Sequence, residues 1–540
     1  MPTRFHHGTS AHSAPDPAAR SSPRRPWARW AALGLLGLAP LIASGPIDAQ
    51  VRLPSMGEAS AEDLPSGVER RYGDQIMREV WRDPAFLDDP VLQEYLQSLW
   101  QPLLEAARRR GDIDDGLWGQ FAWTVFLVQD RSVNAFALPG GYVGVHLGLI
   151  AMTASSNELA SVLAHELSHV TQRHIARGVA NSSRQSMAGL AAMILGALAA
   201  SRAGSAEMAQ AAITGSQAAV MQGQLNFSRD MEREADRIGF GIFRDAGFSP
   251  AGMASMFEKM DQAARLNDNG SFPYLRSHPL TVERMSEART RATMSDARPM
   301  QPESTHALMQ ARARVLMDQS AEGLRRLMAA ANPSDAAMPG DLYGAALAAT
   351  RLKEFGLADQ YLASLRRHAA AARHGQPGLD ILVDQLQIES LLARGDADGA
   401  ARVLASARRP ASRATLLLKA QASVQVRTAE SSTSPGPAEL EQELRTWVVD
   451  HPDDAAAWAL LAQVSDRLGH TLRALRARAE ARAAVGDLPA AIDLLRSAQR
   501  PRPSPSPAEF ADLSVIDSRL KSFEERWRPM APRQGDRTRD

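Results

Sequence analysis

Two histidines and a glutamate stand at a spacing that can bind a metal ion and use it. The motif His-Glu-x-x-His places His165, Glu166 and His169 inside an apolar-periodic run that predicts a helix over residues 159–170. Residues four apart share one face of a helix, so His165 and His169 can offer two imidazoles to one ion. Glu166 can then reach a water molecule at that ion. Two imidazoles suit Zn²⁺, which needs further ligands from elsewhere in the chain.

A second predicted helix, over residues 228–239, offers the third ligand. Glu232 and Asp236 also lie four apart and share a face. Glu232 as a carboxylate ligand gives a His₂Glu site with one open position, and Asp236 can orient a ligand imidazole through its N–H. Glu234 is the competing ligand, but it points about 200° around the helix from Glu232, so both cannot face the metal. The alternative is a charged, solvated helix in which neighbouring arginines pair with these acids.

Two more histidines need an interpretation. A metzincin-type third histidine requires His-Glu-x-x-His-x-x-Gly-x-x-His. Here Gln172 stands at the glycine position and His174 comes one residue early, so we interpret His174 as helix-end polarity and not as a ligand. His278 precedes Pro279, which restricts the local backbone. From a short loop His278 can reach the open metal position or the transition-state oxyanion, and the alternative is a histidine on a surface loop.

Composition limits the class of protein. The 540 residues are enough for two to four domains, and the 61 basic and 61 acidic side chains balance. This balance argues against nucleic acid as the main partner. The chain contains no cysteine, so thiolate metal sites and disulfides are excluded. Metal ligands must therefore be His, Asp or Glu.

The N-terminus predicts export from the cytoplasm. Residues 1–30 are basic, residues 31–43 are apolar, and small residues follow. This order is typical of a secretory signal peptide, and we place its end at residue 49. The apolar run is short for a membrane span. An uncleaved N-terminal anchor is the alternative, and either reading places the working protein outside the cytoplasm.

The elements around the motif predict a mainly α fold with a small β-sheet. Residues 50–115 have helical spacing, and strands are expected at 123–128 and 142–146, with a turn at Gly140-Gly141. An edge strand here could bind an extended peptide, and the 142–146 strand is our candidate. Residues 187–224 contain long uncharged runs. They predict an apolar helical hairpin packed on the catalytic part or, alternatively, a lid or membrane-surface element.

From residue 305 to 500 the sequence is rich in Ala, Leu and Arg, with recurrent helical pairs. One unit matches tetratricopeptide positions well, at Trp458, Leu461, Ala462, Ala474 and Ala481. Small side chains there let antiparallel helices pack closely and stack into a solenoid. A generic Ala-rich bundle is the alternative. Residues 501–540 form a C-terminal segment whose tail is expected to be partly disordered.

The motifs together resemble the M48 family of zinc metalloproteases. The resemblance rests on His165-Glu166-Leu167-Ser168-His169, on Glu232-x-x-Ala235-Asp236 and on the preceding stretch Asn134 to Gly141. It implies a zincin-type (gluzincin) domain over residues 50–300, followed by the tetratricopeptide-like solenoid. It also implies one Zn²⁺ per chain held by His165, His169 and Glu232. Glu166 and Asp236 are the catalytic residues, Glu166 as general base and Asp236 as the group that orients a ligand imidazole. His278 is placed near the metal, as a possible fourth ligand or regulator.

With a signal peptide and repeats, the resemblance implies a periplasmic endopeptidase for misassembled outer-membrane proteins that also aids β-barrel assembly. Unfolded or misassembled outer-membrane proteins would be its clients, and the repeats would contact the assembly machinery. Peripheral membrane contact is possible, and no nucleic acid is expected. The alternative is a mainly non-proteolytic assembly factor with a latent or structural zinc site.

Overall fold

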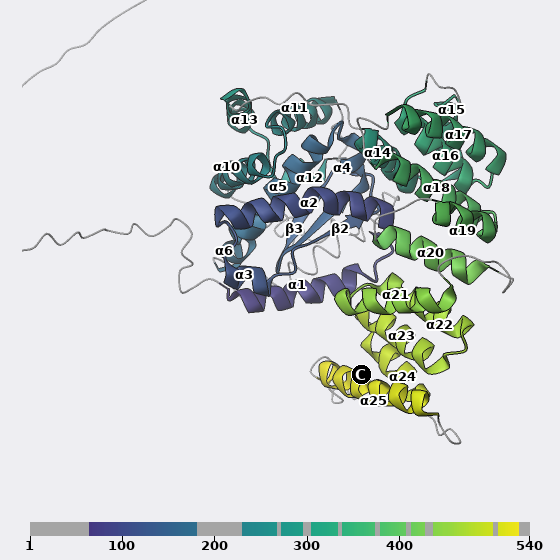
Figure 1. Cartoon of the computed structure of the whole chain (residues 1–540). Coiled ribbons are helices and arrows are strands. Elements are labelled where there is room, and N and C mark those ends of the chain that lie inside the picture. The colour runs from purple at the N-terminus through teal and green to yellow at the C-terminus, as the bar shows by residue number, and fades with distance from the viewer. Residues whose placement is uncertain are drawn as a thin grey trace, which may run out of the picture. The chain divides into compact units, whose positions relative to one another are not determined.

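The computed structural model describes several stretches of the chain, which are drawn in colour in Figure 1. They are residues 64–180, 229–266, 272–294, 304–332, 337–372, 378–406, 412–426, 436–499 and 506–528. The expected signal peptide (1–49) and hairpin or lid (187–224) lie outside the described residues. Helices dominate these stretches, and all their strands belong to one sheet, which confirms the mainly α fold with a small β-sheet. Among these residues, no helix combines the length and apolar character needed to cross a bilayer.

The sheet is mixed and has the strand order β1-β2-β4-β3. Strands β2 and β4 run parallel, with Val125 opposite Val143, whereas β1 pairs antiparallel with β2 and β3 antiparallel with β4. The strands expected at 123–128 and 142–146 are present as β2 and β4, while β1 and β3 are not among the predicted strands. The strands are β1 (Phe86–Leu87), β2 (Thr124–Val128), β3 (Ala135–Leu138) and β4 (Tyr142–His146).

Two glycines make the turn between β3 and β4. Gly140 and Gly141 have φ angles of +78° and +89°, which favour glycine. A Cβ atom on Gly140 would also lie 2.8 Å from the Cα of Arg70 in α1 (Ser66–Val80). The expected turn is confirmed, and it folds β3 back along β4.

Helix α5 (Ser156–Thr171) carries the His-Glu-x-x-His motif, and all of its residues are buried. Helix α10 (Arg229–Asp245) packs closely on α5, because Gly239 faces it: a Cβ atom there would lie 3.0 Å from the carbonyl oxygen of Ala164. Figure 1 shows α2 running across the sheet, which it contacts at β2. The remaining helices of this part are α2 (Pro90–Arg110), α3 (Asp115–Gln120), α4 (Leu147–Met152), α6 (His174–Ala180), α11 (Ala251–Leu266), α12 (Pro273–Ser277) and α13 (Val282–Met294).

A two-residue break at Gln172 and Arg173 separates α5 from α6. Arg173 has a φ of +52°, a conformation that costs a non-glycine residue on the order of 1 kcal/mol. Buried Glu69 in α1 compensates, because its carboxylate accepts a hydrogen bond from Nε of Arg173 at 3.1 Å. The same guanidinium donates to the carbonyl oxygen of Leu64. This anchored turn starts α6 at His174, directly after Arg173.

The C-terminal region is an array of helices. Successive helices pack pairwise, for example α16 on α17, α22 on α23 and α24 on α25. The array continues past residue 500, into α25. Its helices are α14 (Ser304–Met317), α15 (Ala321–Ala329), α16 (Pro339–Arg351), α17 (Phe355–Ala372), α18 (Leu379–Ala393), α19 (Ala397–Ser406), α20 (Arg413–Gln425), α21 (Pro437–Asp450), α22 (Ala455–Arg467), α23 (Thr471–Ala484), α24 (Leu488–Ala498) and α25 (Pro507–Trp527).

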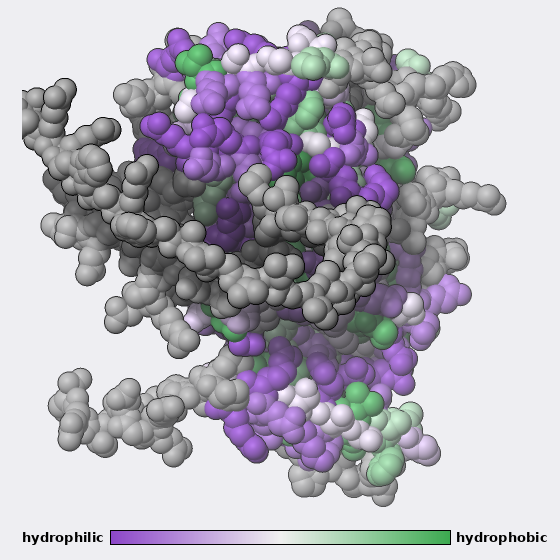
Figure 2. Space-filling view, turned by 90° about the vertical axis from the view of Figure 1, so that its left-hand side faces the viewer, coloured by the Kyte–Doolittle hydropathy of each residue, from purple (hydrophilic) through white to green (hydrophobic). Residues whose placement is uncertain are grey.

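Small side chains allow close packing in this array. Ala462 in α22 and Ala474 in α23 are buried, and Ala462 belongs to the same apolar cluster as Trp458. The turn between these helices uses Gly469 at a φ of +77°. This arrangement is consistent with a tetratricopeptide-like solenoid. On the face drawn in Figure 2, the described surface is mostly hydrophilic with scattered hydrophobic residues, as expected when most apolar side chains lie in cores.

Buried polar contacts join the array to the protease part. Arg312 of α14 is 2% exposed and donates two hydrogen bonds, of 2.7 and 2.8 Å, to Asp89 at the start of α2. It also donates to Glu389 of α18 at 2.8 Å. Tyr95 of α2 hydrogen-bonds with Nδ1 of His306 at 2.5 Å. One cluster of buried apolar side chains includes residues of both α5 and α16, so the two parts share a core.

Candidate metal centre

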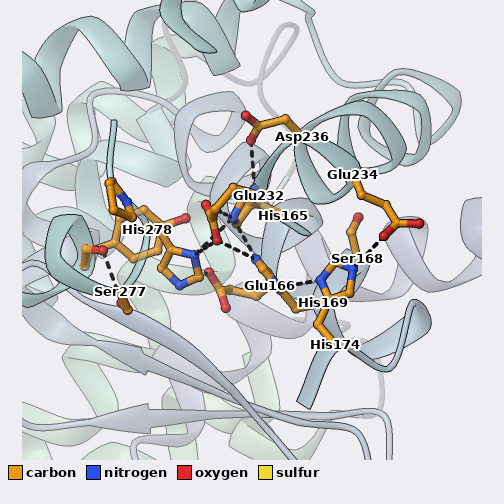
Figure 3. Close-up of polar contacts among 12 residues, drawn as sticks. His165, Glu166, Ser168, His169, His174, Glu232, Glu234, Asp236, Ser277 and His278 are labelled. Carbon is orange, nitrogen blue, oxygen red and sulfur yellow. Dashed lines mark hydrogen bonds and ion pairs between the residues drawn. The ribbon is translucent and has the colours of Figure 1, made fainter. Parts of the chain in front are cut away.

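Four side chains from three elements meet at one buried point. Helix α5 supplies His165 and His169 from adjacent turns, α10 supplies Glu232, and the loop after α12 supplies His278. All four are between 0 and 3% exposed, and their ligand atoms lie within 4.8 Å of one another. Figure 3 shows them pointing toward one another. The structure therefore brings together the three residues expected as ligands and the one expected as a fourth ligand or regulator.

The distances within this group fit a cation. The two Nε2 atoms of His165 and His169 lie 3.0 Å apart, and the carboxylate of Glu232 is 3.5 and 3.4 Å from them. Nδ1 of His278 is 2.9 Å from Glu232 and 3.3 Å from Nε2 of His165. Asp236 lies on the other side of His165, with Oδ1 3.0 Å from Nδ1, so that its negative charge favours a proton on that nitrogen. The lone pair on Nε2 of His165 is thus directed into the group, as a metal ligand requires.

The electrostatics of the centre also favour a positive charge. Burial disfavours the charge on Glu232, but His278, His165 and His169 outweigh it and hold the pKa of Glu232 far below its ordinary value. Burial opposes protonation of His165, yet Asp236 and Glu232 raise its pKa to about 10. Burial lowers the pKa of neighbouring His169 well below its ordinary value. The carboxylates therefore stabilise positive charge among these imidazoles, which a metal ion can supply.

Glu166 faces the same space from α5. It is fully buried, and neither carboxylate oxygen accepts a hydrogen bond from the described residues. Nε2 of His278 lies 3.5 Å from Oε1 of Glu166. Such a desolvated carboxylate with unused lone pairs is costly in an ordinary core. It suits a group that must accept a proton from a substrate or a water molecule.

Arg284 of α13 organises the acidic side of the centre, and the sequence patterns do not assign it a role. It donates to both carboxylate oxygens of Asp236, at 2.6 and 2.8 Å. Its Nη1 lies 2.9 Å from Glu232 and donates to the carbonyl oxygen of Pro279 at 2.8 Å. Burial disfavours the charge on Asp236, but Arg284 and His165 outweigh it and lower the pKa of Asp236. Arg284 thus connects a ligand, its supporting carboxylate and the loop that carries His278.

His174 lies at a helix end, as expected, because it is the first residue of α6, but it has a closer relation to the centre than helix-end polarity implies. It is fully buried, and its Nδ1 lies 2.8 Å from Nδ1 of His169. The Arg173 turn, which breaks the helix, brings it there. Its Nε2 contacts Glu234 at 3.0 Å, and burial lowers the pKa of His174 to about 4. Glu234 points away from the four-residue group and also accepts a hydrogen bond from Arg177 at 2.9 Å, so it does not compete with Glu232 (Figure 3).

The strand that was expected to bind an extended peptide, β4, is not an edge strand of the sheet. Strand β4 is bonded to β2 on one side and to β3 on the other, so it has no open edge. Strand β3 ends the order of described strands and packs beside α5. Since an extended peptide adds to an open sheet edge, β3 replaces β4 as the candidate.

Comparison with known proteins decides the family. The sequence model of peptidase family M48 matches residues 90–292, which include every residue of the centre. The beta-barrel assembly-enhancing protease of Escherichia coli K12 is 31% identical over 500 residues, covering 89% of this chain and 94% of that protein. The chain belongs to peptidase family M48.

Further relatives agree with this assignment. The beta-barrel assembly-enhancing protease of Yersinia pestis is 29% identical over 502 residues, 90% of this M48 peptidase and 94% of that protein. The mitochondrial metalloendopeptidase OMA1 of Saccharomyces cerevisiae is 27% identical over 231 residues, 40% of this chain and 62% of that protein. The chain is therefore a metalloendopeptidase, and its buried His and Glu group can hold the metal ion that the family implies.

Proposed function

We propose that this M48 peptidase is a periplasmic zinc-dependent endopeptidase that acts on misassembled outer-membrane proteins and aids β-barrel assembly. The observation that carries the proposal is the match along 94% of the beta-barrel assembly-enhancing protease of Escherichia coli, because it spans the protease part and the helical array together. The predicted signal peptide supports the periplasmic location.

His165, His169 and Glu232 would hold the ion. Two imidazoles and one carboxylate are a ligand set that Zn²⁺ accepts, and the chain has no cysteine to offer instead. When bound, Zn²⁺ supplies Lewis acidity, which polarises the scissile carbonyl and acidifies the attacking water. Asp236 keeps His165 oriented, and Arg284 keeps Asp236 and Glu232 in place.

Glu166 would act as the general base. Its buried carboxylate takes a proton from the attacking water and later delivers it to the nitrogen of the leaving amine. The substrate would lie extended along β3, so that a backbone carbonyl reaches the space between Glu166 and the ligands. In this arrangement specificity depends on the sheet edge more than on one deep side-chain pocket.

His278 would regulate access to the centre. Its Nδ1 lies among the ligands and its Nε2 faces Glu166, so it occupies the space that substrate and water need. It must therefore leave for turnover. Regulation of this kind suits a protease that meets many unfolded clients. A zinc-loaded resting structure with His278 far from the metal and water in its place would reject this role.

The helical array would bind clients or the assembly machinery. Its buried contacts with α2 fix it to the protease part, so a bound client is held near the catalytic part. This fixed array also favours a second function, an assembly factor in which proteolysis is secondary. Under that alternative, an inactive protease part would still support β-barrel assembly.

The decisive test is Glu166→Gln, which keeps the shape of the side chain but removes the base. We expect unchanged zinc content and a loss of about 10²- to 10⁴-fold in the cleavage of an unfolded β-barrel protein. Cleavage at the wild-type rate would reject the catalytic assignment. If Glu166→Gln supports β-barrel assembly in cells as well as the wild type does, the assembly-factor function is favoured.

A further inference from the structure

His169 lies at one end of a chain of buried hydrogen-bonding groups that leads away from the centre. Its Nδ1 is 2.8 Å from Nδ1 of His174, and Nε2 of His174 is 3.0 Å from Oε2 of Glu234. Arg177 donates to the same oxygen of Glu234 at 2.9 Å. Both histidines are fully buried, and the side chain of Glu234 is 19% exposed. The close-up in Figure 3 shows this chain leading away from the ligands, on the side opposite His278.

The order of partners fixes where the protons lie. A carboxylate only accepts hydrogen bonds, so Nε2 of His174 must carry a proton and donate to Glu234. A neutral imidazole has one N–H, which leaves Nδ1 of His174 as an acceptor. Nδ1 of His169 must then be the donor across the 2.8 Å contact. The remaining nitrogen of His169, Nε2, then carries no proton, and this is the atom that lies 3.0 Å from Nε2 of His165.

We propose that His174 and Glu234 are positioning residues that hold His169 in its metal-binding tautomer. The proposal rests on the proposed zinc centre and deepens it. It gives the two ligand histidines different supports, because His165 meets the carboxylate of Asp236 directly, whereas His169 meets that of Glu234 through a second imidazole. The reverse arrangement, with the proton on Nδ1 of His174, would move the His169 proton to Nε2 and block the metal.

The backbone around His174 serves this contact. The helix of the motif ends two residues before Arg173, and the left-handed turn at Arg173 places His174 over His169. Along an uninterrupted helix, residues five apart would point about 140° away from each other. The ion pair between Arg173 and buried Glu69 holds this turn. A strained turn, a buried ion pair and a buried histidine together support one hydrogen bond to one ligand.

The test is zinc affinity, measured by competition with a chelator on the purified full chain. His174→Phe fills the space but offers no acceptor, so we expect the zinc dissociation constant to rise by about 10- to 100-fold. His174→Gln offers an amide oxygen to His169 and should recover part of this loss. Glu234→Gln should cause a smaller loss than His174→Phe, since an amide can accept from His174 or donate to it. The control is Glu258→Gln, which removes an exposed ion pair with Arg289 in the same part of the molecule and should leave zinc affinity unchanged.

Nitrogen NMR of the zinc-loaded wild type reads the tautomer directly. We expect zinc on Nε2 and a proton on Nδ1 of His169, which a merely structural role of His174 does not require. Zinc on Nδ1 of His169, or equal zinc affinity in His174→Phe and the Glu258→Gln control, would overturn the inference. If His174→Phe does not fold, the wild-type spectrum and Glu234→Gln decide. A wild type that takes up no zinc overturns the proposed function as well, whereas one that binds zinc with an unsupported His169 rejects only the inference.

Discussion

The metal centre and the second half of the helical array differ in what they bury. Around the centre, α5 and α10 place His165, Glu166, His169, Glu232 and Asp236 in the core at 0 to 4% exposure. The contact between α22 and α23 buries mostly alanine, leucine and tryptophan. Charges in a core are costly unless a partner neutralises them, whereas small apolar side chains stabilise a helix pair by close packing. The stability of the centre should therefore depend on its ionic partners, whereas that of the array should depend on the volume of its buried side chains.

The junction between the protease part and the start of the array resembles the centre, because it also buries paired charges. Arg312 is buried with Asp89 and Glu389, although it belongs to the array. Replacing Arg312 with Leu leaves two carboxylates without their cation, so we expect a loss of about 3–5 kcal/mol in the free energy of unfolding. The measurement is denaturant unfolding. The matched control is Arg326→Leu, whose ion pair with Glu322 is exposed and should contribute about 1 kcal/mol or less. Equal losses of stability in Arg312→Leu and Arg326→Leu would contradict the idea that buried ion pairs hold the junction.

Removing the metal should affect the protease part and leave local packing in the array intact. Zinc at 1,000 times its dissociation constant stabilises the folded state by about 4 kcal/mol. We expect a chelator to lower the melting temperature of the wild type and to have no effect on His165→Ala, which cannot form the full site. Calorimetry with and without chelator measures this. An identical melting temperature under both conditions would contradict the role of a cation in holding these groups together.

The array should respond to added volume and not to chelation. Ala474 of α23 is fully buried, so Ala474→Leu overfills its packing contacts and should cost about 1–3 kcal/mol. Ala508→Leu, on the exposed face at the start of α25, is the control and should be nearly neutral. Zinc content should stay at the wild-type value in both variants. A neutral Ala474→Leu would show that this contact is looser than the structure indicates.

The smallest effect is expected at His278. If it blocks the open position in part of the molecules, His278→Ala should raise cleavage by about 2- to 10-fold, since the rate scales with the competent fraction. Peptidase assays on an unfolded β-barrel protein measure this, with zinc content as the check that the ligands remain intact. A fall in cleavage at full zinc content would make His278 part of the catalytic machinery instead of a regulator.

Much of the centre can be predicted from the sequence, because its ligands follow helical spacing. His165 with His169, and Glu232 with Asp236, are pairs four residues apart, and local periodicity places each pair on one face. The packing of α5 against α10 is a tertiary contact, and the residue spacing within each helix does not predict it. The burial of His278 and its contact with Glu232 also depend on distant segments.

The features that the sequence patterns do not predict depend on a helix break or on contacts between distant segments. His174 reaches His169 only because Arg173 adopts a left-handed conformation. Arginine rarely adopts it, so the residue type gives no sign of the turn. Strand β3 is short, and its existence depends on pairing with β4. Arg284 lies 48 residues from Asp236, and periodicity does not connect them. The sequence thus predicts which residues act, while tertiary packing decides which groups hold them.

X-ray absorption at the zinc edge, on the purified full chain, tests the central claim most directly. We predict one zinc per chain with only nitrogen and oxygen ligands, at the usual distances of about 2.0–2.2 Å. The signal should disappear in the double variant His165→Ala, His169→Ala. A zinc-supplied wild type without stoichiometric metal, or a double variant that keeps the same zinc spectrum, would contradict the assignment of this centre.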